Sequence, residues 1–442
     1  MTDDKFINIK YRSQVEWTER VKFKSYKLGI AYIFVMLIML IFINPAYATS
    51  HTFQDFLFDA CRNAQPGSDF DIRCNVDSNQ GDLSGDSEDS LNPTQSLSNL
   101  SSALAETRAR IKSLQIKMKQ QREKNKASMS ASEDQQSAME TFQMEGFSVL
   151  LNGENGKLTH QLTPLERGYD TDTVKIQGGV DFRLTDDWII GAIVSIENYK
   201  TLFDADGAGR NFLPGNSEGS SDGDSVAVNI LTTKNIDQSF YLDALLSYSW
   251  IDYSFSRVGL FQESSRTTPT IEVNTTANTS GKQLALALGA GWDHSSGAHN
   301  YQVFSRVSFQ YSQIDGYAEK GGAGFAMRIN DKSANETVLT LGLKYAYTIN
   351  NSFGVLVPQL FVEYENLLKS DVQTTTSSFV SDNNQTQFSV QGDKIDRKYG
   401  RMGASMVSVL PNGWTFFLSA SKVFAKDLIE QSRFNAGLRK EF

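Results

Sequence analysis

The sequence predicts an all-β fold, a closed antiparallel barrel that crosses a membrane with its strands. Residues 140–442 consist of runs in which apolar and polar side chains alternate over about ten residues or more, the length that a tilted strand needs to cross a bilayer. Short turns and long polar connections alternate between these runs. A mean hydropathy of -0.34 excludes a multi-helix membrane protein, but it permits a barrel because a polar lumen dilutes the apolar signal.

An export signal is predicted at the amino terminus, in residues 1–48. One uninterrupted apolar stretch, Leu28–Ile43, follows seven basic residues and precedes a small-x-small Ala-Tyr-Ala exit. This order is typical of a secretory signal peptide that is cut between Ala48 and Thr49. The alternative is a retained membrane helix, but the 16 residues of the stretch fall short of the ~20 that a spanning helix needs.

Residues 49–95 are predicted to form a short acidic, passenger-like segment with one cysteine pair. Residues 49–103 carry two basic and nine acidic side chains, a net charge of -7. Because an exported segment meets an oxidising compartment, Cys61 and Cys74 are expected to form a disulfide. Two free thiols in a flexible segment are the alternative. The stretch Gln80–Asn99, rich in Gly, Asp, Ser and Asn, predicts a flexible linker.

A basic amphipathic helix is predicted over residues 96–139. Leu97, Leu104, Ile111 and Met118 recur at one heptad position, which is the spacing of a single helix face. Residues 104–130 carry eight basic and two acidic side chains, too much of one sign for a self-associating coiled coil. The other faces of the predicted helix carry seven cations, which are Arg108, Arg110, Lys112, Lys117, Lys119, Arg122 and Lys124.

Twelve strands are predicted in residues 140–442, an even number as in bacterial single-chain barrels. Within one run, Leu242 and Leu246 share a face and Asp243 and Ser247 share the other. The runs lie near 146–155, 173–184, 187–200, 223–234, 237–253, 281–294, 299–314, 335–349, 353–368, 397–410, 413–425 and 431–442. Tight turns are expected near 185–187, 234–236, 350–351 and 411–413, and long polar loops at 202–223, 256–281, 315–335 and 369–397.

No catalytic residue, cofactor site or metal site is predicted from the sequence. Only two cysteines are present, too few for a multi-cysteine metal centre, and the net charge of -9 speaks against a nucleic-acid partner. His294 and His299 flank a polar hairpin, where solvated side chains are more common than metal ligands. Gly85-Asp86-Ser87 lies in the predicted linker without room for a histidine partner, so it does not predict an esterase nucleophile.

Several blocks of the barrel region resemble the β-domain of the autotransporter family of type V secretion. The blocks are SFYLDALLSYSWIDYSFSR at 239–257, the stretch 315–365, YGRMGASMVSVLPNGWTFFLSAS at 399–421 and the terminal RFNAGLRKEF, in the family's order. The resemblance implies a twelve-stranded barrel in a Gram-negative outer membrane, with the basic helix threaded through its lumen toward an exported passenger. It also implies a monomeric barrel that contacts outer-membrane lipid and is inserted by the barrel-assembly machinery with periplasmic chaperones.

The resemblance extends to the last strand, which is expected to close the barrel and carry an assembly signal. Phe434, Leu438 and Phe442 are expected to face lipid. Lys440 departs from the family, which usually has an aromatic residue at that position. A lysine near the rim can extend its ammonium group to water, so the departure has a small cost.

The predicted function is that of an outer-membrane translocator, not an enzyme, that displays or secretes its own amino-terminal segment. That segment is expected in the periplasm during biogenesis and at the surface afterwards, and it is too short for a β-helical passenger. Two alternatives remain open, which are a passive or helix-plugged pore and a small surface adhesin built on the cysteine pair. Asn125 follows the basic helix without a double-Asn motif, so self-cleavage is not expected.

Overall fold

The computed structural model describes residues 53–76, 95–131, 147–163, 166–204, 219–261, 271–371 and 373–442. The predicted export signal and its cleavage site at Ala48 and Thr49 lie outside these residues, and their prediction stays open. Within the described residues, no helix combines the length and the apolar character required to span a membrane.

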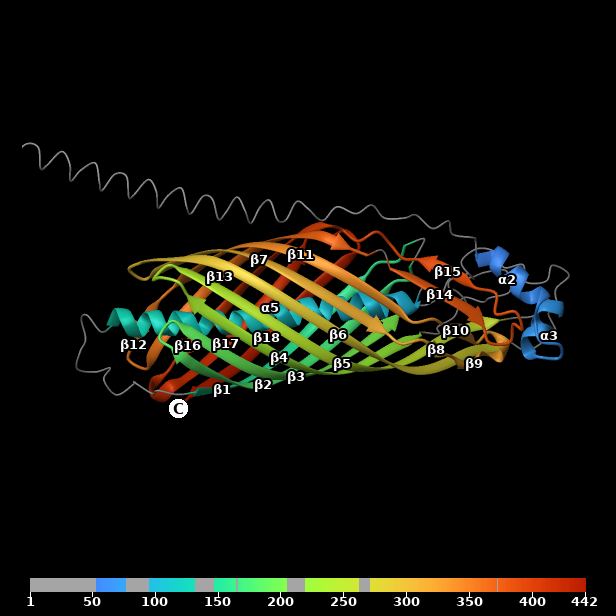
Figure 1. The fold of residues 1–442 in the computed structure, drawn as a ribbon, viewed down its shortest axis with the longest axis horizontal. Coiled ribbons are helices and arrows are strands. Elements are labelled where there is room, and N and C mark those ends of the chain that lie inside the picture. The colour runs from blue at the N-terminus through green and yellow to red at the C-terminus, as the bar shows by residue number, and fades with distance from the viewer. Residues whose placement is uncertain are drawn as a thin grey trace, which may run out of the picture. The chain divides into compact units, whose positions relative to one another are not determined.

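A closed antiparallel barrel of twelve strands forms the body of the protein (Figure 1). The strands are β1 (Phe147–His160), β2 (Tyr169–Thr185), β3 (Trp188–Phe203), β4 (Ser220–Asn235), β5 (Phe240–Phe261), β6 (Ile271–Ser296), β7 (His299–Ile314), β11 (Lys332–Tyr347), β13 (Gly354–Ser370), β16 (Lys398–Val409), β17 (Trp414–Phe424) and β18 (Ile429–Glu441). Strands β1 and β18 pair from Ser148↔Glu441 to His160↔Ile429, which closes the barrel. The predicted fold class is therefore confirmed, and each of the twelve predicted runs contains a strand.

Alternation along the strands separates a lipid-facing surface from a lumen. On β5 the side chains of Leu242, Leu246 and Trp250 are about half exposed, while Asp243 and Ser247 are buried inside the barrel. The apolar side chains lie outside because the hydrocarbon of a bilayer offers no hydrogen bonds, and the closed sheet satisfies its backbone groups internally.

Two strands are much longer than predicted. Strands β5 and β6 pair continuously from Phe240↔Trp292 to Phe261↔Ile271, far into the stretch 256–281 that was expected to be a loop. The apolar pattern stops where polar residues such as Thr275 and Thr276 begin, so hydrophobicity marks the membrane boundary and not the strand end. Outside the bilayer, backbone pairing continues because polar β-branched residues also suit a strand.

Two other predicted loops contain regular structure. The connection at 315–335 holds β8 (Tyr317–Ala318), β9 (Lys320–Gly321), the 3₁₀ turn η2 (Gly322–Gly324) and β10 (Met327–Ile329). The connection at 369–397 holds β14 (Thr374–Phe379) and β15 (Phe388–Gln391). Strands β15, β14, β10 and β8 form a four-stranded sheet beyond the barrel, and β9 pairs with β6. At the other rim the connections are short, with β12 (Ile349–Asn351) and the turn η3 (Pro411–Gly413).

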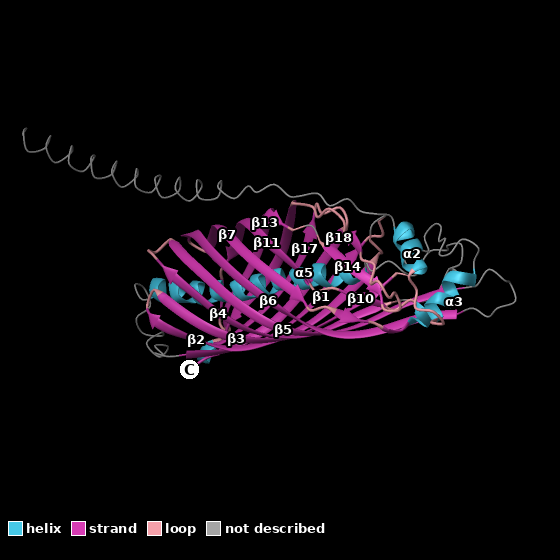
Figure 2. Cartoon of the chain, turned by 45° about the vertical axis from the view of Figure 1, so that its right-hand side comes forward, coloured by secondary structure: helices cyan, strands magenta, loops and turns pink. Residues whose placement is uncertain are grey.

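Three helices precede the barrel in the described chain (Figures 1 and 2). The short helices α2 (Phe53–Arg62) and α3 (Asp69–Val76) lie beside the four-stranded sheet, and residues 53–76 are called the cap below. The long helix α5 (Gln95–Ala131) runs through the barrel. Because α5 begins at Gln95, the linker predicted over Gln80–Asn99 is wrong for its last five residues.

Candidate functional site: the helix-filled lumen

Apolar side chains of helix α5 contact several strands of the barrel wall. Ile111 and Leu114 pack with the small residues Ala285 and Ala287 of β6, and their cluster extends to Leu150 of β1 and Phe417 of β17. Leu104 packs elsewhere, against Tyr253 and its neighbours. Small residues on β6 let the helix approach the wall closely there, and apolar contacts hold α5 from more than one side of the lumen.

Gly289 and Gly291 of β6 lie against side chains of the neighbouring strand β5. A Cβ atom on Gly289 would lie 2.1 Å from Asp243 Oδ1, and one on Gly291 would lie 2.3 Å from the Tyr241 hydroxyl. Both glycines therefore make room for a large side chain of the neighbouring strand β5. Cross-strand neighbours therefore occupy the space next to both glycines.

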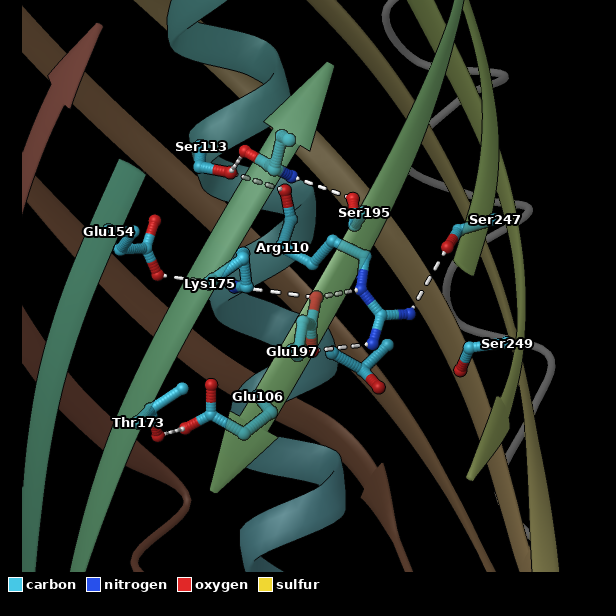
Figure 3. Close-up of polar contacts among 12 residues, drawn as sticks. Glu106, Arg110, Ser113, Glu154, Thr173, Lys175, Ser195, Glu197, Ser247 and Ser249 are labelled. Carbon is cyan, nitrogen blue, oxygen red and sulfur yellow. Dashed lines mark hydrogen bonds and ion pairs between the residues drawn. The ribbon is translucent and has the colours of Figure 1, made fainter. Parts of the chain in front are cut away.

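A paired guanidinium group anchors the middle of the helix (Figure 3). Arg110 Nε donates to Glu197 Oε1 at 2.6 Å, and Arg110 Nη2 donates to Glu197 Oε2 at 2.8 Å. Both side chains are at most 1% exposed. Such a bidentate pair is geometrically specific. Breaking a buried pair of this kind by removing one partner leaves an uncompensated charge, which typically costs about 3–5 kcal/mol.

The Arg110 pair is one end of a chain of six alternating charges. Lys175 Nζ lies 3.6 Å from Glu197 Oε1 and 3.2 Å from Glu154 Oε1. Arg433 bridges the remaining step, with 2.9 Å to Glu154 Oε1 and 2.6 Å to Glu106 Oε1. The chain thus begins and ends on α5 and passes through β3, β2, β1 and β18 between these ends.

The basic helix is not the only source of positive charge in this chain of ion pairs. Helix and wall each contribute both signs, since Glu106 is acidic and Lys175 and Arg433 are strand cations. Alternation matters physically because each of the four inner charges then has an opposite charge within reach on both sides, and each end charge has one, which offsets the cost of removing them from water. The network ties α5 to the two strands that close the barrel.

A second group of ion pairs holds the other side of the helix. Lys112 Nζ lies 3.0 Å from Glu363 Oε2 and also contacts Glu365, and Arg401 Nε lies 3.6 Å from Glu365 Oε1. One turn away, Arg108 lies 3.6 Å from Glu336. The structure therefore brings three of the seven predicted helix cations against carboxylates of the barrel wall.

The remaining predicted helix residues lie outside what the structure describes in side-chain detail. Lys117, Lys119, Arg122 and Lys124 belong to α5, and so does Asn125, but the described side chains of this helix end at Leu114. Their predicted contacts with the lumen stay predictions.

Neutral polar groups complete the fit between helix and wall. Gln283 of β6 accepts a hydrogen bond from Thr107 Oγ1 at 2.6 Å and donates one to the Ala103 carbonyl oxygen at 2.9 Å. Near the start of the helix, Ser96 Oγ donates to Thr375 Oγ1 of β14 at 2.9 Å. Helix α5 is therefore bonded along its described length to residues far away in sequence, which no local pattern reveals.

The cap is held by an aromatic core beyond the barrel. Phe56 stacks on Phe388 with 4.7 Å between ring centroids, and Phe70 lies 4.6 Å from Phe379. These rings belong to an apolar cluster with Phe325, Met327 and Ile329. A Cβ on Gly324, whose φ is +100°, would lie 2.5 Å from the Phe70 backbone nitrogen, so only glycine permits this approach.

The two cysteines form a disulfide inside the cap. Cys61 and Cys74 are bonded, with 5.4 Å between their Cα atoms, and they join α2 to α3. Backbone bonds attach the cap to the connection between β14 and β15, including Gln65 N–H to the Ser381 carbonyl oxygen at 2.9 Å. The linked segment is helical and packed, which the acidic composition of residues 49–103 did not reveal.

The predicted terminal residues lie on the closing strand and at its end. Phe434 is half exposed on the outer surface, while Leu438 is partly covered. Phe442 stacks on Phe147 with 5.4 Å between ring centroids, and its backbone N–H donates to the Phe147 carbonyl oxygen at 3.1 Å. The last residue of the chain therefore contacts the first residue of β1.

At the opposite rim, three polar groups converge near the start of α5. His160 ends β1, Glu166 lies in the connection to β2, and Asp393 follows β15. Burial raises the pKa of the Glu166 carboxyl group to about 7. Asp393 lies more than two hundred positions from His160 and Glu166, so no local pattern predicts this cluster.

Comparisons with known proteins agree with this architecture. The sequence model of the Autotransporter beta-domain matches residues 149–421. The translocator domain of autotransporter NalP from Neisseria meningitidis is 15% identical, with a TM-score of 0.51 over 72% of this chain and 98% of that one. No curated protein matches the sequence.

Two further solved structures match the chain at lower similarity. The transport unit of the autotransporter AIDA-I from Escherichia coli is 11% identical over 72% of this chain and 97% of that one, with a TM-score of 0.45. The beta domain of the Bordetella autotransporter BrkA is 16% identical over 68% of this chain and all of that one, with a TM-score of 0.43. The family model matches more than half of the residues of this chain. The chain therefore belongs to the autotransporter β-domain family and is an outer-membrane translocator barrel.

Proposed function

We propose that this barrel carries its own amino-terminal segment across the outer membrane and retains it at the cell surface as the docked cap. The path of α5 carries the proposal. The helix begins beside the four-stranded sheet at the rim with the long connections, and it runs toward the rim with the short turns (Figure 1). In outer-membrane barrels the short turns face the periplasm and the long connections face outward, so residues before Gln95 belong outside.

The docking contacts favour retention over release of a free passenger. The cap shares an apolar core with β10, β14 and β15 and has backbone bonds to their connection. A segment built to leave the cell surface would gain nothing from burying Phe56 and Phe70 against the barrel's own connections. The small-adhesin alternative would use the exposed surface of this cap.

A helix-plugged pore is the second candidate function. The ion-pair network favours it, and it is compatible with the first proposal because the same barrel can display the cap and be closed by α5. The six alternating charges from Glu106 to Arg110 fix α5 against the wall at mid-lumen. Conductance of the intact protein in planar bilayers should be low, and deletion of residues 97–126 should raise it. Equal conductance of the two proteins would contradict a plugged lumen.

Epitope insertion tests the proposed display directly. An epitope after Ser50 should bind antibody on intact cells, and exogenous protease should remove it. The matched control is the same epitope after Asn351, in the turn at the opposite rim, which should bind only after the outer membrane is permeabilised. Protection of the Ser50 epitope in intact cells would place the segment in the periplasm and contradict the proposal.

We also propose that Phe442 serves as part of the assembly signal read by the barrel-assembly machinery. Its stacking on Phe147 and its backbone bond to the same residue support a role in joining the two ends of the sheet. Deletion of Phe442 should lower the yield of the heat-modifiable folded species in outer-membrane fractions. The control variant Phe353→Ala removes an exposed aromatic residue at the same rim, and its yield should stay normal. A normal yield without Phe442 would contradict the role.

A further inference from the structure

Three side chains with metal-binding groups meet at the outward end of the lumen. His160 Nε2 lies 3.8 Å from Asp393 Oδ2 and 4.0 Å from Glu166 Oε2. All three ligand atoms lie within 4.8 Å of one another. These separations are longer than a hydrogen bond, so the three groups face a common point without bonding to each other there.

The imidazole ring of His160 is held in place, but one of its nitrogen atoms lacks a hydrogen-bond partner among the described residues. His160 is 5% exposed, and its ring stacks on Tyr169 with 4.8 Å between centroids and 4° between planes. Its Nδ1 atom has no hydrogen-bond partner in the described part of the chain. A buried ring nitrogen without a partner is costly. The fixed ring nevertheless aims Nε2 at two carboxylates, an orientation that a ligand could use.

The two carboxylates are oriented by hydrogen bonds from a neighbouring hydroxyl group and a backbone N–H. Thr163 Oγ1 donates to Asp393 Oδ2 at 2.6 Å, and the Asp393 backbone N–H donates to Glu166 Oε1 at 2.6 Å. A Cβ atom on Gly392 would lie 2.3 Å from Glu166 Oε1, so a larger residue there would displace this carboxylate where the two connections approach. Outer hydrogen bonds of this kind orient the ligands of protein metal sites.

We propose that His160, Glu166 and Asp393 bind one divalent metal ion of the zinc class. One imidazole nitrogen with two carboxylate oxygens is a ligand set that suits zinc, whereas calcium and magnesium prefer oxygen ligands alone. Two ligands of a tetrahedral zinc ion at about 2.1 Å lie roughly 3.4 Å apart. The two separations from His160 Nε2 therefore need to contract by about half an ångström, and the separation between the two carboxylate oxygens, which is within 4.8 Å, by up to about 1.4 Å. A fourth position remains for water or for a further group.

The ion would join two connections that are distant in sequence beside the start of α5. One is the β1–β2 connection and the other follows β15, and Leu97 of α5 lies 3.2 Å from the same Cβ position on Gly392. A bound metal would therefore fix both connections around the first turns of the helix. This inference concerns metal binding alone and does not depend on where the cap is displayed.

Metal titration of the full-length, tag-free protein in detergent micelles tests the site. After treatment with EDTA and its removal, wild type should bind one equivalent of Zn²⁺ in competition with a chelating dye, and millimolar Ca²⁺ or Mg²⁺ should not displace it. His160→Ala should abolish this binding, and Thr163→Val should weaken it about tenfold because an outer hydrogen bond is lost. The double variant His294→Ala/His299→Ala, altered at the opposite rim, is the matched control and should bind normally.

Two outcomes would overturn the proposal. One is unchanged Zn²⁺ affinity in folded His160→Ala, and the other is binding of Ca²⁺ in preference to Zn²⁺. If His160→Ala does not fold, Co²⁺ spectroscopy on wild type decides. Visible absorption typical of tetrahedral nitrogen and oxygen ligands supports the site, and a spectrum of hydrated Co²⁺ contradicts it.

Discussion

The lumen and the cap hold neighbouring parts of one chain by opposite chemistry. In the lumen, α5 is tied to the wall by buried ion pairs, of which Arg110–Glu197 is bidentate. In the cap, Phe56 and Phe70 pack in an aromatic core, and a disulfide joins α2 to α3. Both regions are buried, yet one is organised by charge and the other by apolar contact.

This difference agrees with the environment of each region before α5 and the cap are in place. A lumen without its helix is a water-filled channel, so charged side chains of wall and helix are hydrated until they pair. The aromatic side chains of the cap would be exposed to water until they reach β10, β14 and β15. Burial of apolar surface then favours docking at that place. We therefore expect charge substitutions to weaken the lumen contacts most, and truncation of apolar side chains to weaken the cap contacts most.

The largest effect is expected from Arg110→Glu. This change places a carboxylate beside Glu197 and interrupts the six-charge chain, and it should cost at least the ~3–5 kcal/mol of a broken buried pair. The temperature of the heat-modifiable transition should fall and conductance should rise. The swap Arg110→Glu/Glu197→Arg is the control and should recover much of both. A single variant with wild-type conductance would contradict the anchoring role of this pair.

Truncation in the cap core comes next. Phe379→Ala removes the ring that contacts both Phe56 and Phe70, and a buried Phe→Ala change typically costs about 3–5 kcal/mol. Because this core lies beyond the barrel, residues 53–76 should become sensitive to added protease while the heat-modifiable transition of the barrel stays in place. Loss of the barrel transition would mean that cap and lumen are one cooperative unit.

A smaller effect is expected from removing the disulfide. The double change Cys61→Ser/Cys74→Ser should destabilise the cap by about 2–3 kcal/mol, the chain-entropy estimate for a short loop. Proteolysis of the cap should accelerate less than in Phe379→Ala, and barrel assembly should be normal. Mobility on non-reducing gels should change only for variants that lose the bond. Free thiols titrated in the exported wild type would contradict the disulfide.

The smallest effect is expected from an ion pair outside the lumen. Lys422 and Glu430 lie 3.2 Å apart, but both side chains are 64% exposed. Solvent-exposed pairs typically contribute about 0–1 kcal/mol, so Lys422→Gln should leave the heat-modifiable transition almost unchanged. A decrease as large as that of Arg110→Glu would show that burial is not what gives the lumen pairs their strength.

The strand positions were predictable because membrane strands have a two-sided environment. Leu242 and Asp243 must face lipid and lumen respectively, so alternation identifies each crossing. The extension of β5 and β6 was not predictable in this way, since beyond the bilayer its outer face is polar, as at Thr276, while Val273 on the other face packs in the cap core. The same holds for β14 and β15, whose buried face packs in that core.

The candidate site was predictable only in part. Arg108, Arg110 and Lys112 could be identified from the sequence as cations of the helix, because the spacing of the apolar residues leaves them on its other faces. Such a basic surface needs a polar partner. Their partners could not be assigned, since the pairing of α5 with Glu197 depends on the rotation of the helix in the lumen. Glu106 could not be singled out from the sequence, because it is one of two acidic residues in the basic stretch 104–130 and its place in the six-charge chain depends on its contact with Arg433.

Closure of β1 against β18 makes the barrel a ring around its own chain. A thread inside a closed ring cannot leave sideways, so α5 can be withdrawn only lengthwise, or after the β1–β18 seam opens. The folded, disulfide-bonded cap at one end is broader than a single helix and acts as a stopper. Helix and barrel are in this respect interlocked mechanically. The lifetime of the threaded state depends on how fast the cap unfolds or the β1–β18 seam opens, and not only on the strength of the contacts between α5 and the barrel wall.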